Sequence, residues 1–246
     1  MMKLIMKVLI PFVGMVLMGQ LACGSAIELP SSRRAEKAIK RVRPSLQKEL
    51  VEASMELGNP IFIRIFKQEM ELEVWLKSGN RFKLFKTYQI CTYGGAGIGP
   101  KTLYGDGKAP EGFYFVKPLQ LNPYSQFHLS FNLGYPNNYD RHHKRTGSAL
   151  MVHGECVSIG CFAMTNPSIE EIYALAVSAF KQGQPFFRVH IFPFRMTDKA
   201  MSNHQNSYWY SFWKNLKEGY DWFEQAGFIP PNVDVKKGRY VFDSSN

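Results

Sequence analysis

Apolar and polar residues alternate along much of the region between residues 61 and 90, and this pattern predicts β-strands. The alternating runs lie at 61–65, 70–76 and 82–90. A period of two places apolar side chains on one face of a strand. The short polar connections at 67–69 and 78–80 predict antiparallel neighbours. Further strands are predicted at 113–116, 150–153 and 187–192, so the core is expected to be mainly β.

Two later segments show helical spacing of apolar residues. The first follows a cap at Asn166 or Ser168, has Pro167 in its first turn and is expected to end at Gly183. The second covers 207–217, with Gly219 as its expected stop. Its aromatic stripe is expected to pack against the sheet, and it consists of Trp209, Phe212, Trp213 and Leu216. A small hairpin is predicted at 233–242.

A basic segment, residues 27–58, precedes the strands. It is rich in Arg and Lys, and Pro44 is expected to interrupt any helix. A linker with a short helix is therefore predicted. Contact with the cell wall or a membrane surface and a merely solvated basic face both remain open.

A glycine-rich run at 94–100 invites comparison with a phosphate-binding loop. Such a loop needs Lys and Ser or Thr after its last Gly and a helix thereafter. Here Pro100 follows, and Gly105, Gly107 and Pro110 come next. Turns beside a sheet explain this run better.

The chain begins like an exported protein. Lys3 and Lys7 precede a short apolar run and then Ala22, Gly24 and Ala26, which is the order of a cleavable signal peptide at 1–26. The run is too short to span a bilayer comfortably. A lipoprotein signal ending at Cys23 is the alternative, and an uncleaved anchor is the third.

Export changes how the net charge and the cysteine content are interpreted. The formal charge of +10 falls to +8 without Lys3 and Lys7, and a basic surface suits polyanions. Export excludes nucleic acid and favours anionic wall polymers or lipids in the periplasm. Cys91, Cys156 and Cys161 then lie in an oxidising compartment. Because three is odd, at least one lacks a partner in the chain, and a Cys91–Cys156 disulfide is one pairing.

The segment 151–164 carries the chemistry. A thiol attacks as the thiolate, and a nearby imidazole is the usual means of forming one. His153 is expected at a strand end, and Cys161 follows a turn that Gly160 permits, just before the first predicted helix. Backbone N–H groups of Gly160 and Cys161 are expected to stabilise an oxyanion.

Two other interpretations compete. His153, Cys156 and Cys161 could bind zinc, although the spacing lacks a CxxC pair and a fourth ligand nearby. Alternatively, His153 and Cys161 are unrelated core residues.

The run His153-Gly154 followed by Ser158-Ile159-Gly160-Cys161 resembles the signature of YkuD-type L,D-transpeptidase domains, HG, a spacer, then SHGC. Residues 105–113 and 131–137 resemble other segments of that family. From about 60 to 240 the chain is similar to the YafK branch of the family.

The resemblance implies a largely β, α+β catalytic domain with mixed sheets and a few packed helices. It also implies a thioester acyl-enzyme on peptidoglycan stem peptides that contain meso-diaminopimelate, with no metal or organic cofactor. Cys161 would be the nucleophile, His153 the general base, and Gly154 would hold the imidazole through its carbonyl. Ser158 and Gly160 would shape the turn.

Three departures from the signature concern substrate binding. Ile159 replaces a His, Ala163 replaces an Arg, and the spacer is short. An Arg grips a carboxylate well, so other basic side chains are expected to substitute for it. The candidates are Arg141, His142, His143, Lys144 and Arg195.

The predicted organisation is a signal peptide at 1–26, a basic linker at 27–58, a catalytic domain at 59–193 and a C-terminal appendage at 194–246. The expected function is an enzyme on wall peptides, with hydrolytic release of murein-bound lipoprotein preferred over transpeptidation. A peptidoglycan-binding module without chemistry is the alternative.

Overall fold

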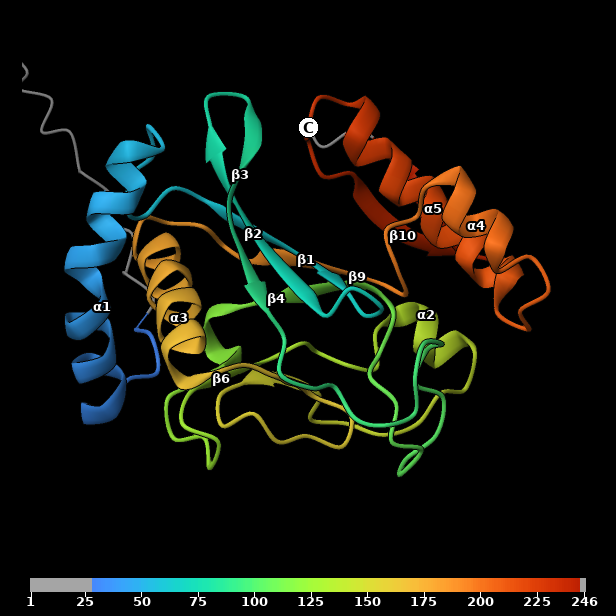
Figure 1. The fold of residues 1–246 in the computed structure, drawn as a ribbon, viewed down its shortest axis with the longest axis horizontal. Coiled ribbons are helices and arrows are strands. Elements are labelled where there is room, and N and C mark those ends of the chain that lie inside the picture. Colours follow the sequence, from blue (N-terminus) through green and yellow to red (C-terminus); the bar gives the residue numbers. More distant parts are fainter. Residues whose placement is uncertain (1–27, 244–246) are drawn as a thin grey trace, which may run out of the picture.

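A computed structural model describes residues 28–243 of the protein, arranged around two β-sheets and a C-terminal hairpin (Figure 1). The signal peptide predicted at 1–26, including Cys23, lies outside the described residues. Within 28–243, no helix is both long enough and apolar enough to cross a membrane.

The main sheet has five strands in the order β3-β2-β1-β9-β4. Their bounds are β1 Ile61–Phe66, β2 Glu71–Ser78, β3 Arg81–Gln89, β4 Gly112–Val116 and β9 Phe187–Phe192. β1 pairs antiparallel with β2 and parallel with β9, which makes the sheet mixed. The strands predicted from alternation are confirmed.

Both faces of this sheet are covered. Helices α1 (Arg33–Glu52) and α3 (Asn166–Lys181) pack on the face that carries Ile61, Ile63 and Ile65. Helices α4 (Asp198–Asn203) and α5 (Tyr210–Gln225) lie toward the other end in Figure 1, where the aromatic stripe of α5 packs against Phe66. Every residue of β1 is therefore buried.

A second, smaller sheet carries the motif segment. Its order is β5-β6-β7-β8, with β5 Leu121–Asn122, β6 Ser130–Asn132, β7 Met151–His153 and β8 Phe162–Ala163. A 3₁₀ turn (η1, Pro118–Gln120) and helix α2 (Asn138–His142) flank it. Because β8 runs directly into α3, and α3 returns the chain to β9, the two sheets share one core.

The expected break at Pro44 is wrong. Helix α1 runs unbroken for 20 residues with Pro44 inside it on the exposed side. An internal proline costs a helix roughly 3 kcal/mol. The helix nevertheless persists because it buries an apolar stripe against α3, consisting of Ala35, Ala38, Val42, Leu46 and Leu50. Burying several such side chains contributes more than the proline costs.

Two details of the later helices also differ from expectation. Thr165, rather than Asn166 or Ser168, is the N-cap of α3, and its hydroxyl accepts from the Ser168 N–H. Gly219 does not end α5. It lies inside the helix, where a Cβ would come within 2.5 Å of a ring carbon of Phe242. Gly219 therefore allows α5 to pack closely against Phe242.

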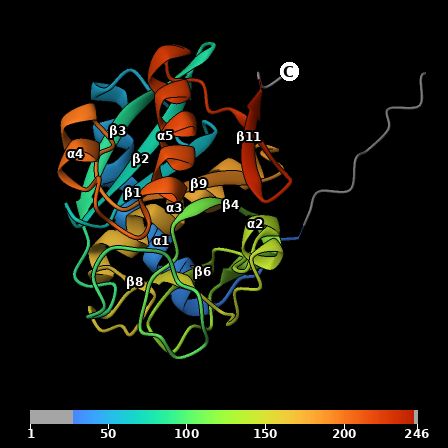
Figure 2. The same cartoon turned by 90° about the vertical axis from the view of Figure 1, so that its right-hand side faces the viewer.

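The predicted tail hairpin is confirmed as β10 (Asn232–Lys236) and β11 (Arg239–Asp243). Seen from the end of the molecule, the hairpin stands beside α5 (Figure 2). The side-chain amide of Asn215 on α5 donates to the Tyr240 carbonyl, and its oxygen accepts from the Tyr240 N–H. Hydrogen bonds thus join α5 to the hairpin within the C-terminal appendage, which also packs on the sheet.

Candidate active site

Strands β7 and β8 bring His153 and Cys161 to one face of the small sheet. The two strands pair in parallel, with Val152 opposite Phe162 and His153 opposite Ala163. Val152 and Phe162 enter the core. Because side chains alternate along a strand, His153 and Cys161 project from the other face. The Met151 N–H donates to Cys161 Sγ at 3.4 Å.

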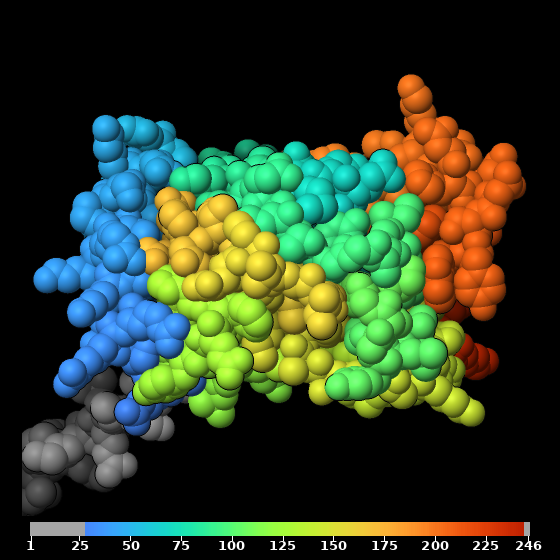
Figure 3. Space-filling view, turned by 60° about the horizontal axis from the view of Figure 1, so that its bottom comes forward, coloured from blue at the N-terminus to red at the C-terminus, as the bar shows by residue number. Residues whose placement is uncertain are grey.

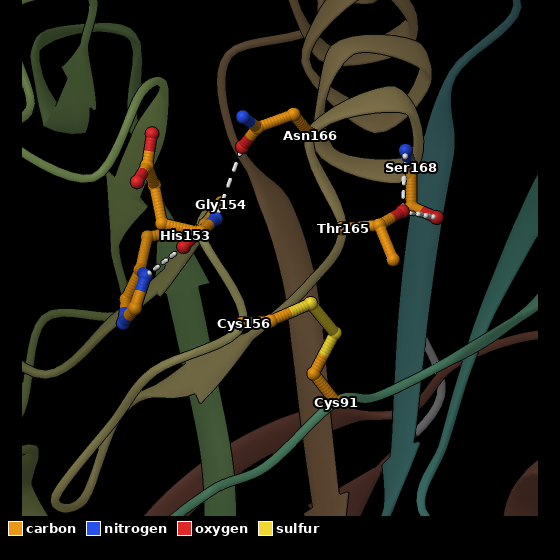
Figure 4. Close-up of a disulfide and its surroundings, with 8 residues drawn as sticks. Cys91, His153, Gly154, Cys156, Thr165, Asn166 and Ser168 are labelled. Carbon is orange, nitrogen blue, oxygen red and sulfur yellow. Dashed lines mark hydrogen bonds between the residues drawn. A yellow bond between two sulfur atoms is a disulfide. The ribbon is translucent and has the colours of Figure 1, made fainter.

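The imidazole of His153 is held in one orientation. Its Nδ1–H donates to the carbonyl oxygen of Gly154 at 2.6 Å (Figure 4). Since a carbonyl only accepts, this bond leaves the lone pair on Nε2 and makes that nitrogen the basic atom. The ring of Phe127 packs on the imidazole at 4.7 Å between centroids. Burial lowers the pKa of His153 below its usual value, more than the Gly154 hydrogen bond raises it.

Gly154 has no room for a side chain. A Cβ there would lie 2.4 Å from Asn166 Oδ1 and 3.1 Å from the Cβ of His128. The same Asn166 oxygen accepts from the Glu155 N–H at 3.0 Å (Figure 4). The start of α3 therefore fixes the backbone that orients the base.

A tight turn places Cys161. The Ser158 hydroxyl donates to the Cys161 carbonyl at 2.7 Å and accepts from the Cys161 N–H at 2.8 Å. Gly160 has φ +130°, a conformation that side chains rarely adopt. The Cys161 N–H, expected to face an oxyanion, is thus already engaged. The Gly160 N–H has no hydrogen-bond partner within residues 28–243, so it is the better candidate donor.

The cysteine count allowed a Cys91–Cys156 disulfide without requiring it, and this disulfide is present. Cys91, just after β3, is bonded to Cys156 in the loop between base and nucleophile (Figure 4). Among the described residues, Cys161 is the one free cysteine. Cys156 therefore has no thiolate to offer a metal, which contradicts the zinc interpretation.

Lys101 supplies positive charge near the nucleophile. Burial raises the pKa of Cys161, while the Met151 N–H and the charge of Lys101 act in the opposite direction. Lys101 Nζ is fixed by Asp106 at 2.8 Å and by the Leu103 carbonyl at 2.9 Å. Three backbone N–H groups and Lys101 stabilise the Asp106 carboxylate and lower its pKa to about 2 despite its partial burial. Residues 101–108 thus form a preorganised loop.

Three of the proposed substrate-binding residues are bonded to other segments of the chain. Arg141 binds Pro136 O and Asn138, and His143 bonds to the Gly238 carbonyl at 2.9 Å. Arg195 is paired with Glu71 and Glu73 on β2. Within residues 28–243, none of the predicted group makes a hydrogen bond or ion pair to residues 154–161; the group comprises Arg141, His142, His143, Lys144 and Arg195.

Exposed apolar side chains lie on the turn that carries the nucleophile and on the loop beside it. Ile159 is 92% exposed and Val157 56%, both on the turn that carries Cys161. On the neighbouring loop, Leu103 is 60% and Tyr104 84% exposed. The two loops touch, since a Cβ at Gly160 would lie 3.2 Å from the Lys108 carbonyl oxygen. Ala163 is buried.

A match to the L,D-transpeptidase catalytic domain family, YkuD, covers residues 60–191. This is more than half of the chain. The chain belongs to this family. The resemblance drawn from the residues around His153 and Cys161 is thereby confirmed.

One named relative and two solved structures are also similar to the chain. A protein of Escherichia coli strain K12 named "Putative L,D-transpeptidase YafK" is 50% identical over 185 residues, which are 75% of this chain and 74% of that protein. A point mutant of the helical cell shape determining protein Pgp2 from Campylobacter jejuni is 18% identical, with TM-score 0.45 over 78% of this chain and 65% of that one. Bd1075 of Bdellovibrio bacteriovorus is 20% identical, with TM-score 0.41 over 73% and 78%.

Sequence reasoning missed the parts of this L,D-transpeptidase site that come from distant segments. Asp106 lies in the segment 105–113 that resembles the family, whereas Lys101 and Phe127 belong to no motif. Their distance along the chain from Cys161 left no periodic signal. A basic residue directly after the Gly99-Pro100 turn was the available hint.

Proposed function

We propose that this L,D-transpeptidase-family chain acts on peptidoglycan and releases proteins attached to it. The substrate would be a stem peptide in which a carbonyl of meso-diaminopimelate is joined to the side-chain amine of a lysine in a lipoprotein. The observation that carries the proposal is the shared face of His153 and Cys161 beside an exposed apolar rim.

The chemistry requires one base and one nucleophile. Nε2 of His153 takes the proton from Cys161 as Sγ attacks the substrate carbonyl carbon. The tetrahedral oxyanion would be stabilised by the Gly160 N–H, and the leaving amine takes the proton back from Nε2. The thioester is then cleaved by water, with Nε2 again the base, to give a carboxylate and the free thiol. No cofactor enters this sequence.

The rim supports hydrolysis over transfer. A competing amine must be held in line with the thioester and stripped of water before it attacks. The exposed side chains on the turn and on the neighbouring loop include Val157, Ile159, Leu103 and Tyr104, and the first three offer no hydrogen-bonding group to such an amine. Water can attack the thioester without being held in place by side chains in this way. The same apolar surface suits the protein attached to the leaving amine.

Purified enzyme should be incubated with sacculi that carry covalently attached lipoprotein, with Cys161→Ala as the matched control. Soluble lipoprotein should appear with wild type only. New muropeptide dimers joined between diaminopimelate residues, with no lipoprotein released, would instead show true transpeptidation.

A peptidoglycan-binding module without chemistry is separated by a different measurement. Intact mass spectrometry after incubation with a carbapenem should show an adduct on wild type and none on Cys161→Ala. The proposal also places the enzyme in the periplasm, which fractionation would test.

A further inference from the structure

A cavity in the described part of the chain is remote from the active site. It lies between the first half of α1 and the second half of α3, and it has a volume of about 890 Å³. Figure 1 shows the two helices side by side at one end of the molecule, and Figure 3 shows the same end with α1 in blue. Val177 stands 11 residues along α3 from Asn166, about 16 Å along the axis.

The lining is largely apolar. The side chains that give it this character are Leu29, Pro30, Ala35, Ile39, Val177, Phe180 and Pro185. The volume falls in the range of sites that bind small organic molecules. An apolar cleft of this size favours an aliphatic or aromatic occupant.

One residue of the cavity lining carries a buried hydroxyl group. Tyr173 is fully buried and lines the cavity, and its hydroxyl has no hydrogen-bond partner within residues 28–243. Buried hydroxyls are nearly always hydrogen-bonded, because an unmade bond is costly. Phenylalanine would fill the same space without that cost, so the hydroxyl calls for an acceptor from outside the chain.

The lining of the cavity carries three cations and two carboxylates, those of Glu28 and Glu36. Lys40, Arg43 and Lys181 line it, and no ion pair of the described residues uses them. Of the acidic residues there, Glu36 accepts from the Ser31 hydroxyl. The exposed face of α1 adds further cations, namely Arg33, Arg34, Lys37 and Lys48. Such a surface attracts an anionic membrane leaflet.

We propose that the cavity takes one acyl chain of an anionic membrane lipid. The chain lies on the apolar wall between α1 and α3, the Tyr173 hydroxyl donates to the ester carbonyl, and the phosphate meets Lys40 and Arg43. Wall polymers and nucleic acids share the negative charge but have no acyl chain. The inference does not depend on the reaction at Cys161.

Vesicle flotation tests the charge and the cavity separately. The purified chain should float with phosphatidylglycerol–phosphatidylcholine vesicles and remain behind with phosphatidylcholine alone. Lys40→Gln/Arg43→Gln should weaken binding about thirtyfold, given roughly 1 kcal/mol for each charge at the surface. The matched control, Lys199→Gln/Lys214→Gln, removes the same charge from exposed positions on α4 and α5. It should change binding less than threefold.

Two further variants address the acyl chain. Tyr173→Phe should weaken binding about tenfold while the melting temperature stays the same or rises, because a buried unpaired hydroxyl is removed. Ile39→Trp should fill the cavity and abolish binding in a chain that still melts cooperatively. In calorimetry, lauroyl lysophosphatidylglycerol should bind and glycerol 3-phosphate should not.

Several results would overturn the assignment. Equal loss in the two double variants, or equal binding of the head group alone, would show charge attraction without an acyl site. Binding that appears only after residues 1–27 are removed would assign the cavity to the N-terminal segment. Dimerisation blocked by Ile39→Trp would assign it to a second copy of the chain.

Discussion

Removal of the Cys91–Cys156 disulfide should destabilise the fold far more than it impairs the chemistry. The bond joins residues 65 apart in the sequence. In the chain-entropy account, a loop of this length restricts the unfolded state by about 4 kcal/mol at 25 °C. We therefore expect Cys91→Ser/Cys156→Ser to lose about 4 kcal/mol of unfolding free energy, a large share of the stability of an ordinary domain.

The active-site loop keeps other attachments without this bond. The Cys156 N–H donates to the Met164 carbonyl at 3.3 Å, and the Glu155 N–H donates to Asn166 at 3.0 Å. Ser158 closes the turn at Cys161 independently. At a temperature well below the midpoint, the acylation rate should therefore fall by less than tenfold.

The assay combines urea unfolding with acylation by a carbapenem, followed by intact mass. Wild type, the double variant and Cys161→Ser are compared, because the last removes a thiol without opening the disulfide. A stability loss below about 1 kcal/mol would refute the loop-entropy reasoning. A folded double variant that no longer acylates would show that the disulfide itself positions the nucleophile.

Further predictions concern single residues. Cys161→Ala should abolish lipoprotein release while circular dichroism and the melting temperature hardly change. Lys101→Met removes a charge that lowers the pKa of Cys161, so acylation should slow at neutral pH and recover at higher pH in a pH–rate profile. His190 is buried and its pKa lies well below 6.5, so only the unfolded state takes up its proton as pH falls. Urea unfolding should therefore show stability lost below pH 6.5, by up to about 1.4 kcal/mol per pH unit, and His190→Phe should flatten that slope. Gly219→Ala should lower the unfolding free energy by roughly 1–3 kcal/mol in denaturation curves, because its Cβ would lie 2.6 Å from Phe113.

The strands were predictable because alternation is a local signal. The bounds of the helices were predictable only where a local sequence rule decided them. Pro44 and Gly219 both predicted helix ends, and both lie inside helices. In each case tertiary packing outweighed local preference: α1 buries its stripe on α3, and α5 needs a residue without a side chain beside Phe113. Neither contact can be read from the neighbouring sequence.

The active site also has one part that the local sequence predicted and another part that depends on long-range contacts. His153 was expected at a strand end and Cys161 after a turn, and the structure has His153 at the end of β7 and Cys161 directly before β8. Lys101 and Asp106 reach the site from a loop about 55 residues earlier in the sequence. The electrostatic environment of the thiol therefore depends on long-range folding. The basic residues chosen from sequence, such as Arg195, are engaged elsewhere.

The pKa directions at the site describe a neutral resting pair. Burial raises the pKa of Cys161 and lowers that of His153, so at neutral pH the thiol keeps its proton and the imidazole is free to accept it. Thiolate then forms as the substrate carbonyl is attacked. A protonated thiol is also slow in disulfide exchange, because the thiolate is the attacking species. With Cys91 and Cys156 already bonded to each other, the one free thiol of the described chain is kept available for attack on the substrate.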